Sequence, residues 1–105
     1  MWGIVFLASS LACSAPAPSA QVHTVRGVLL DVESPSIQKV DGFTLRSDDG
    51  QELHFVTASN FNQGASHLMT PGHMRQHMAL ADPVEVTYRE DSGNFVAVSA
   101  VDVSQ

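Results

Sequence analysis

The chain has 105 residues, with eleven acidic and five basic side chains and a formal net charge of −6 at pH 7. This balance argues against nucleic-acid binding, because such affinity depends on Lys and Arg side chains that neutralise phosphates. It also argues against adsorption of the domain to an anionic membrane surface. The hydrophobic content of 44% is ordinary for a globular protein, and the length allows one domain.

The first residues are predicted to direct the protein out of the cytoplasm. Residues 1–12 are almost continuously apolar and end at Cys13, the single cysteine. The run is shorter than the roughly 20 residues of a membrane-spanning helix but suits the hydrophobic part of an export signal. Pro16 and Pro18 among small residues then predict an extended tether. We expect an export signal over 1–12, a tether over 13–21 and one folded domain over 22–105.

The segment Ser10-Leu11-Ala12-Cys13 resembles a bacterial lipobox. This resemblance implies that Cys13 is acylated and becomes the mature N-terminus, so that the protein is attached to the periplasmic side of a membrane through lipid alone. Simple signal cleavage and secretion is the alternative, since Ser10 and Ala12 also satisfy the small-x-small rule. A third alternative is a hydrophobic N-terminus that packs on the domain.

Three strands are predicted in the first half of the domain. Residues 22–33 alternate over a long run, in which Gly27 marks a bulge or a bend. One face of this strand would carry Val28, Leu30 and Val32, and the other Val25, Leu29 and Asp31. Phe43 and Leu45 alternate with polar residues in a second strand. Asp49-Gly50 then forms a hairpin turn to a third strand with Leu53, Phe55 and Thr57 on one face.

The second half is predicted to hold one helix and two strands. Thr70 can cap the helix and Pro71 suits its first position, so we expect a helix over 71–81 that ends before Pro83. Residues 84–89 alternate as a fourth strand. Residues 95–103 are apolar on both faces, which suits a fifth strand that is either buried on both sides or located at a barrel seam.

This order of elements is typical of an OB-fold-like closed barrel, a mainly β fold with five strands and one helix between strands 3 and 4. An SH3-like barrel or a small open sheet is the alternative. Three segments resemble small exported bacterial OB-fold domains, many of them lipoproteins of unassigned function: residues 25–32, 73–78 and 82–89. The resemblance implies a binding module of the cell envelope.

One cluster of side chains has ligand chemistry: His67, Met69, His73, Met74, His77 and Met78. On a helix, His73 and His77 share one face, and Met74 and Met78 share the neighbouring stripe. Imidazole and thioether are soft ligands that suit Cu(I) and Ag(I). The architecture also resembles a periplasmic copper and silver chaperone family, whose ion is held by His, two Met and a Trp on barrel strands. Here the cluster lies on or beside the helix, and Trp2 is the only tryptophan.

Core packing is the alternative explanation of the same cluster. On a helical wheel one arc contains Leu80, His73, His77, Ala81, Met74 and Met78. This arc must also cover the open end of the barrel, and methionine fills irregular gaps well. His77 lies deepest in the arc and suits a structural role. His67 and Met69 precede the cap and are expected to be freer to bind.

No catalytic motif is present in the sequence: it has no Gly-rich phosphate loop, no Gly-x-Ser-x-Gly elbow and no Cys-x-x-Cys pair. Asp48 and Asp49 could be interpreted as a catalytic pair of carboxylates, but they lie in the predicted Asp-Gly turn, and turn formation explains both residues. The first hypothesis is therefore a membrane-tethered, non-enzymatic module without a cofactor, which binds an envelope protein or a small ligand. The alternative is a periplasmic protein that binds copper or silver through the His and Met cluster.

Overall fold

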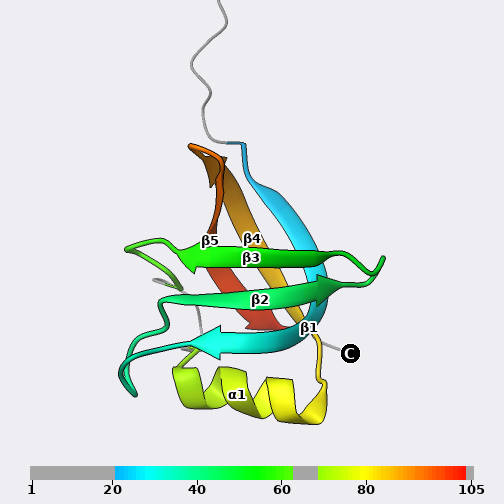
Figure 1. Cartoon of the computed structure of the whole chain (residues 1–105), viewed down its shortest axis with the longest axis vertical. Coiled ribbons are helices and arrows are strands. Elements are labelled where there is room, and N and C mark those ends of the chain that lie inside the picture. Colours follow the sequence, from blue (N-terminus) through cyan, green and yellow to red (C-terminus); the bar gives the residue numbers. More distant parts are fainter. Residues whose placement is uncertain (1–20, 63–68, 104–105) are drawn as a thin grey trace, which may run out of the picture.

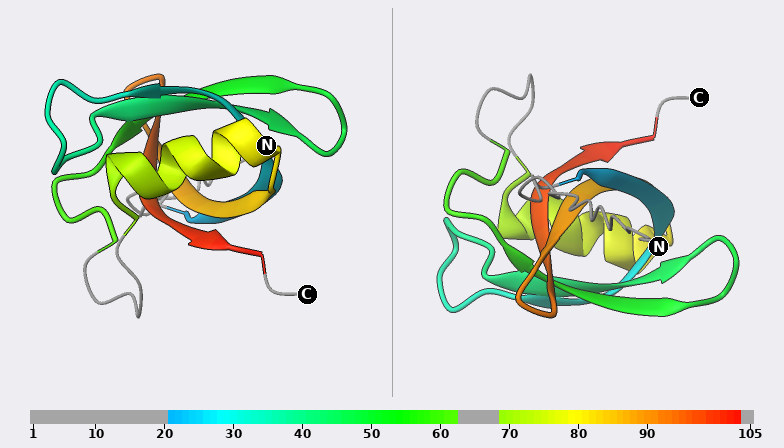
Figure 2. Two further views of the ribbon diagram at one scale, coloured as in Figure 1. Left: turned by 90° about the horizontal axis from the view of Figure 1, so that it is seen from below. Right: turned by 90° about the horizontal axis from the view of Figure 1, so that it is seen from above.

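The computed structural model describes residues 21–62 and 69–103, which form five strands and one helix. In chain order these are β1 (His23–Glu33), β2 (Gly42–Ser47), β3 (Glu52–Thr57), α1 (Pro71–Leu80), β4 (Val84–Asp91) and β5 (Asn94–Asp102). The strands close into a barrel in the order β1-β2-β3-β5-β4, and α1 lies across one end of it (Figures 1 and 2). The predicted closed barrel is confirmed, and an open sheet is excluded.

The predicted export signal, Cys13, the tether up to residue 20 and His67 lie outside the described residues. Within the described part, no helix combines the length and apolar character needed to cross a bilayer.

β1 closes the barrel because it changes partner along its length. Its first half pairs with β4 and its second half with β2, and Gly27 belongs to both ladders, opposite Val84 and opposite Ser47. A Cβ atom on Gly27 would lie 2.1 Å from the carbonyl oxygen of Arg46. Only glycine allows two backbones to approach this closely. Gly27 therefore forms the corner at which β1 curves from one half of the barrel into the other (Figure 1).

The faces predicted for β1 are partly wrong. Pairing with β2 slips between Leu29 and Asp31, which leaves Leu30 as an extra residue in the ladder. Such a bulge reverses the alternation of faces beyond it. Leu29 and Val32 are both buried as a result, whereas Val28 and Leu30 are only half-buried.

The predicted faces of β2 and β3 are confirmed. Phe43, Leu45 and Phe55 are fully buried, with the Phe43 and Phe55 ring centroids 5.2 Å apart. Arg46 and His54 on the opposite faces are exposed. The hairpin turns at Gly50, whose φ of 91° lies in the left-handed region and whose N–H donates to the Ser47 carbonyl.

β5 is a seam strand, which is one of the two alternatives that the sequence predicts. It pairs antiparallel with β4 along most of its length, and its residues Phe95–Ala97 pair parallel with Phe55–Thr57 of β3. Beyond this short parallel ladder, the buried Asn62 side chain donates to the carbonyl of Ala100 at 3.1 Å and accepts from its N–H at 2.8 Å. Asn62 thus replaces a strand residue beside β5.

The helix begins as predicted. The Thr70 hydroxyl accepts from the His73 N–H at 3.1 Å and Pro71 follows the cap. It ends at Leu80, and Ala81 caps it in the left-handed region instead of continuing it.

The predicted inward arc of α1 is too wide. Pro71, Met74 and His77 are buried, but Leu80 is 61% exposed and Ala81 is exposed too. A stripe of residues three apart turns by about 60° at each step around a helix, so the stripe has rotated away from the barrel by Leu80.

The corner can be tested with two glycine substitutions. Gly27→Ala is expected to lower the free energy of unfolding by about 1–3 kcal/mol, because the new methyl group displaces the β2 backbone. Gly72→Ala is the control, since nothing lies within 4 Å of its Cβ position, and it should leave stability unchanged or slightly higher. Urea unfolding of both variants measures the difference; equal stability of the two variants would contradict this role of Gly27.

A second stability test concerns Met74, which is fully buried in the core. Met74→Ala should lower the free energy of unfolding by about 2–5 kcal/mol because it leaves a cavity. Met74→Leu keeps the volume and should cost less than about 1.5 kcal/mol. If urea unfolding shows that Met74→Ala costs no more than Met74→Leu, this methionine does not support the core.

Candidate metal-binding site

The structure separates the predicted imidazoles from the predicted thioethers. Met69 and Met74 are buried in the hydrophobic core and Met78 packs against it. Met69, which was expected to be freer to bind, is only 8% exposed. His73 and His77 lie together on the adjoining side of α1, with ring centroids 4.9 Å apart. Binding of a soft ion by the six-residue cluster stays a prediction, with His67 outside the described residues.

A third side chain, which the sequence did not single out, joins the two histidines. Asp102 Oδ1 lies 2.7 Å from His77 Nε2 and 3.2 Å from His73 Nε2. The topology places it there, since Asp102 at the end of β5 pairs with Val84 at the start of β4, shortly after α1 ends. The Asp102 side chain at the end of β5 consequently reaches α1.

The three side chains can supply donors to one metal ion. One ligand atom from each of His73, His77 and Asp102 lies within 4.8 Å of the other two. Bonds from nitrogen and oxygen to zinc are about 2.0–2.2 Å long, so ligands of one ion stand at most about 4.4 Å apart. The side chains of His73 and Asp102 are 38% and 52% exposed, and small rotations of these two groups close the remaining difference.

The hydrogen bonds of His77 determine where its proton lies. Its Nδ1 is 3.2 Å from the backbone carbonyl oxygen of Asp82, and a carbonyl oxygen only accepts, so Nδ1 carries a proton. In a neutral ring, Nε2 then holds a lone pair that faces the Asp102 carboxylate at 2.7 Å. A proton between the two atoms satisfies both, whereas a metal ion bonded to both at about 2.0–2.2 Å would hold them roughly 3 Å apart or more. The exposed Asp102 side chain can move by that small amount.

The surroundings favour positive charge at this position. Partial burial raises the pKa of Asp102, but hydrogen bonding to His73, the charge of His77 and their further contacts outweigh it and hold that pKa below its ordinary value. Asp102 is therefore ionised at neutral pH. His77 lies in the last turn of α1, where the partial negative charge of the helix C-terminus also favours a cation.

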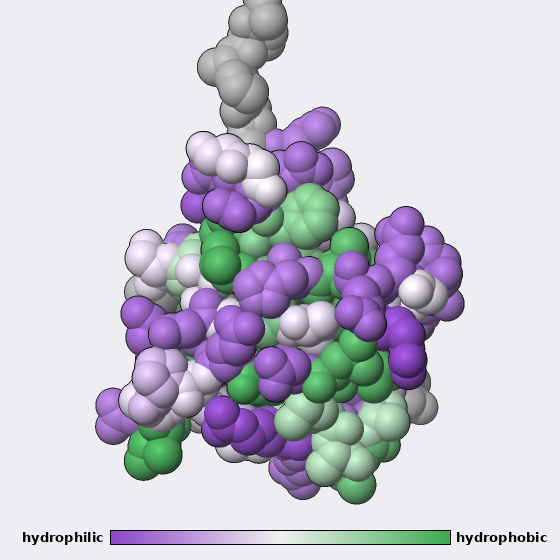
Figure 3. Space-filling model, in the orientation of Figure 1, coloured by the Kyte–Doolittle hydropathy of each residue, from purple (hydrophilic) through white to green (hydrophobic). Residues whose placement is uncertain are grey.

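A cavity of about 370 Å³ adjoins the cluster. His73, His77 and Asp102 line one part of it, and the remainder is lined by Gln76, Leu80, Asp82, Pro83 and Val103. On the face that Figure 3 shows, apolar side chains gather over the C-terminal end of α1, where Leu80 is exposed.

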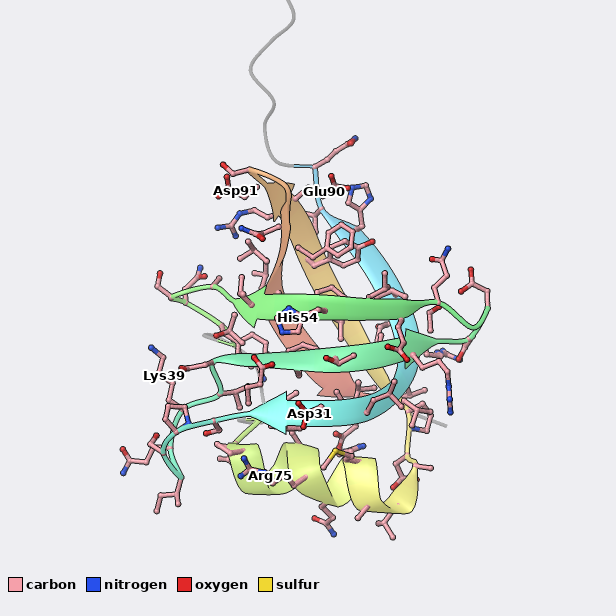
Figure 4. All side chains as sticks on the ribbon, in the orientation of Figure 1. Asp31, Lys39, His54, Arg75, Glu90 and Asp91 are labelled. Atoms are coloured by element: carbon pink, nitrogen blue, oxygen red, sulfur yellow. The ribbon has the colours of Figure 1, made fainter. Side chains whose placement is uncertain are left out.

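A second histidine–carboxylate pair lies on the outer face of the sheet. His54 Nε2 of β3 is 3.2 Å from Glu33 of β1, whose carboxylate reaches across β2 where Gly42 has no side chain. A Cβ on Gly42 would lie 2.8 Å from that carboxylate. His54 points away from the barrel (Figure 4), and both side chains are about half exposed. This pair offers two ligands instead of three.

No protein-family model matches the sequence, and no curated protein matches it either. Solved structures do match. Apo-CusF from Escherichia coli is 12% identical, with 89% of this chain and 100% of that chain covered and a TM-score of 0.61. Ag(I)-bound CusF is 13% identical, covers 81% of this chain and 95% of its own, and gives a TM-score of 0.54. A Cu(II)-bound CusF variant from Escherichia coli is 13% identical, with 80% of this chain and 94% of that chain covered and a TM-score of 0.55. The chain is therefore similar to CusF in its fold.

Proposed function

We propose that this chain is an exported, non-enzymatic metal-binding protein that binds a divalent transition-metal ion through His73, His77 and Asp102. The proposal rests above all on His77, whose Nδ1 donates to a backbone carbonyl while its Nε2 faces an ionised carboxylate. Histidine ligands in metal sites are likewise held by a hydrogen bond from their second nitrogen, which orients the ring and fixes the tautomer.

The donor set selects the class of ion. Two imidazoles and one carboxylate are borderline ligands that suit Zn(II) and Cu(II), and affinity for such a site increases from Ni(II) to Cu(II) and falls again at Zn(II). Copper is therefore expected to bind most tightly among these ions. The structural neighbours carry Cu(II) and Ag(I), which supports metal binding on this kind of barrel without supplying a ligand set for this chain.

Binding of Cu(I) or Ag(I) is the second candidate. It is favoured by the half-buried Met78 thioether, one residue along α1 from His77, and by the Ag(I) of the structural neighbour. This candidate would use His67, Met69, His73, Met74, His77 and Met78. It requires Met69 and Met74 to leave the core, which has a packing cost that the divalent site avoids.

Metal titrations with ligand variants test the two candidates. Cu(II) should bind in an equimolar complex and raise the melting temperature, because an ion that binds only the folded state stabilises it. His77→Ala, His73→Ala and Asp102→Asn each remove one metal ligand and should weaken Cu(II) binding by more than about 100-fold. Removing only a residue that hydrogen-bonds to a ligand typically weakens metal binding by roughly 10–100-fold.

Two controls accompany this titration. His54→Ala removes the exposed histidine of the other pair, and Met78→Leu removes the nearest thioether; both should keep the Cu(II) affinity of the parent chain. Equal Cu(II) binding by the parent and by all three ligand variants would disprove the divalent site. Tight Ag(I) binding that Met78→Leu abolishes would favour the soft-ion candidate instead.

The same proposal includes attachment to a membrane through a lipid on Cys13, because an apolar leader, a lipobox-like segment and a Pro-rich tether follow one another. Mass spectrometry of the protein from a bacterial host should find a mature N-terminus at Cys13 that carries diacylglycerol. Cys13→Ser is expected to release the protein from the membrane fraction. An unmodified N-terminus at another residue would rule out lipidation and leave simple cleavage.

A further inference from the structure

We propose that the metal ion in this site completes its coordination with a small amino-acid-like chelator bound in the adjoining cavity. This inference rests on the proposed function, because it requires an ion on His73, His77 and Asp102. The protein would then bind its metal as a complex with a small molecule.

The number of protein donors leaves room on the ion. His73, His77 and Asp102 supply three ligand atoms among the described residues. Zinc sites with three protein ligands keep a fourth position for water or another ligand, and Cu(II) favours tetragonal coordination by nitrogen and oxygen. A tetragonal Cu(II) ion has four near positions and two more distant ones, so three protein donors leave room for an outside ligand with two donor atoms.

The cavity provides space at that position. All three donor residues line it, so the open side of an ion between them faces its volume of about 370 Å³. This volume lies near the lower end of the range for small-molecule pockets, about 300–1,000 Å³. A ligand of amino-acid size fits such a space.

The lining indicates the chemistry of the ligand. Leu80, Pro83 and Val103 offer apolar surface, and the Gln76 amide and the Asp82 carboxylate offer polar contacts. A dication balances the charge of the Asp102 and Asp82 carboxylates, so a ligand without net positive charge is favoured. An α-amino acid meets these conditions. Its ammonium group releases a proton to solvent when it coordinates, so that the amine and the carboxylate chelate the ion while the side chain contacts the apolar lining.

A graded series of amino acids tests this inference. The whole chain is loaded with equimolar Cu(II), and glycine, alanine and valine are added while the electron paramagnetic resonance spectrum is recorded. The three share one chelating group, so affinity should increase by about fourfold for each added carbon that the lining buries. A ¹⁵N label on alanine should alter the nitrogen hyperfine pattern of the protein-bound copper.

Gln76→Trp is the matched variant, because a bulky side chain there fills the cavity without replacing a ligand atom. It should bind Cu(II) like the parent chain but lose the response to valine. N-acetylalanine, which lacks a free amine, should produce no spectral change with the parent.

The outcomes separate this inference from the function on which it rests. Failure of the parent chain to bind Cu(II) would overturn both. Cu(II) binding with a spectrum that valine leaves unchanged would overturn the chelator alone, and so would removal of the copper as a free amino-acid complex. Light scattering could instead detect copper-dependent dimers that Gln76→Trp abolishes. Such dimers would show that a second copy of the chain occupies the open position on the metal ion, and they would overturn the chelator as well.

Discussion

The close approach of β1 and β2 at Gly27 is the contact on which the barrel depends. At this residue β1 leaves β4 and joins β2, and a side chain there would meet the Arg46 carbonyl oxygen. With that corner in place, β4 returns alongside the first half of β1 and β5 fills the gap to β3. The same arrangement brings the end of β5 to the start of β4, and so brings Asp102 to α1.

Local chemistry made most of the fold predictable from sequence. Alternation identified β2, β3 and β4, the Thr70-Pro71 pair located the start of α1, and Asp49-Gly50 located the hairpin. The errors arose where a single inserted or rotated residue changed a face. Leu30 is an extra residue in the β1 ladder. Nothing in an alternating sequence distinguishes such a bulged hydrophobic residue from its regularly paired neighbours. Leu80 fits the wheel of the helix but lies beyond the barrel that the helix covers.

The candidate site was only half predictable. Histidines four apart on a helix share a face, so the proximity of His73 and His77 followed from spacing. Their neighbours Met74 and Met78 have the same spacing, and only packing decides that the thioethers enter the core while the imidazoles turn to β5. Asp102 is far away in sequence and looks like an ordinary polar residue at a strand end. The closed-barrel topology could have identified it, because strand order places that end beside the helix.

The parallel ladder between β3 and β5 is the shortest junction around the barrel. It joins only Phe55–Thr57 to Phe95–Ala97, whereas β4 and β5 pair along almost their whole length. Parallel pairing is slightly less stable per residue than antiparallel pairing, and local opening begins where the fewest contacts must break. Local opening of the barrel should therefore begin by separation of β3 from β5. Backbone amides at this seam should exchange with solvent deuterium sooner than those between β4 and β5.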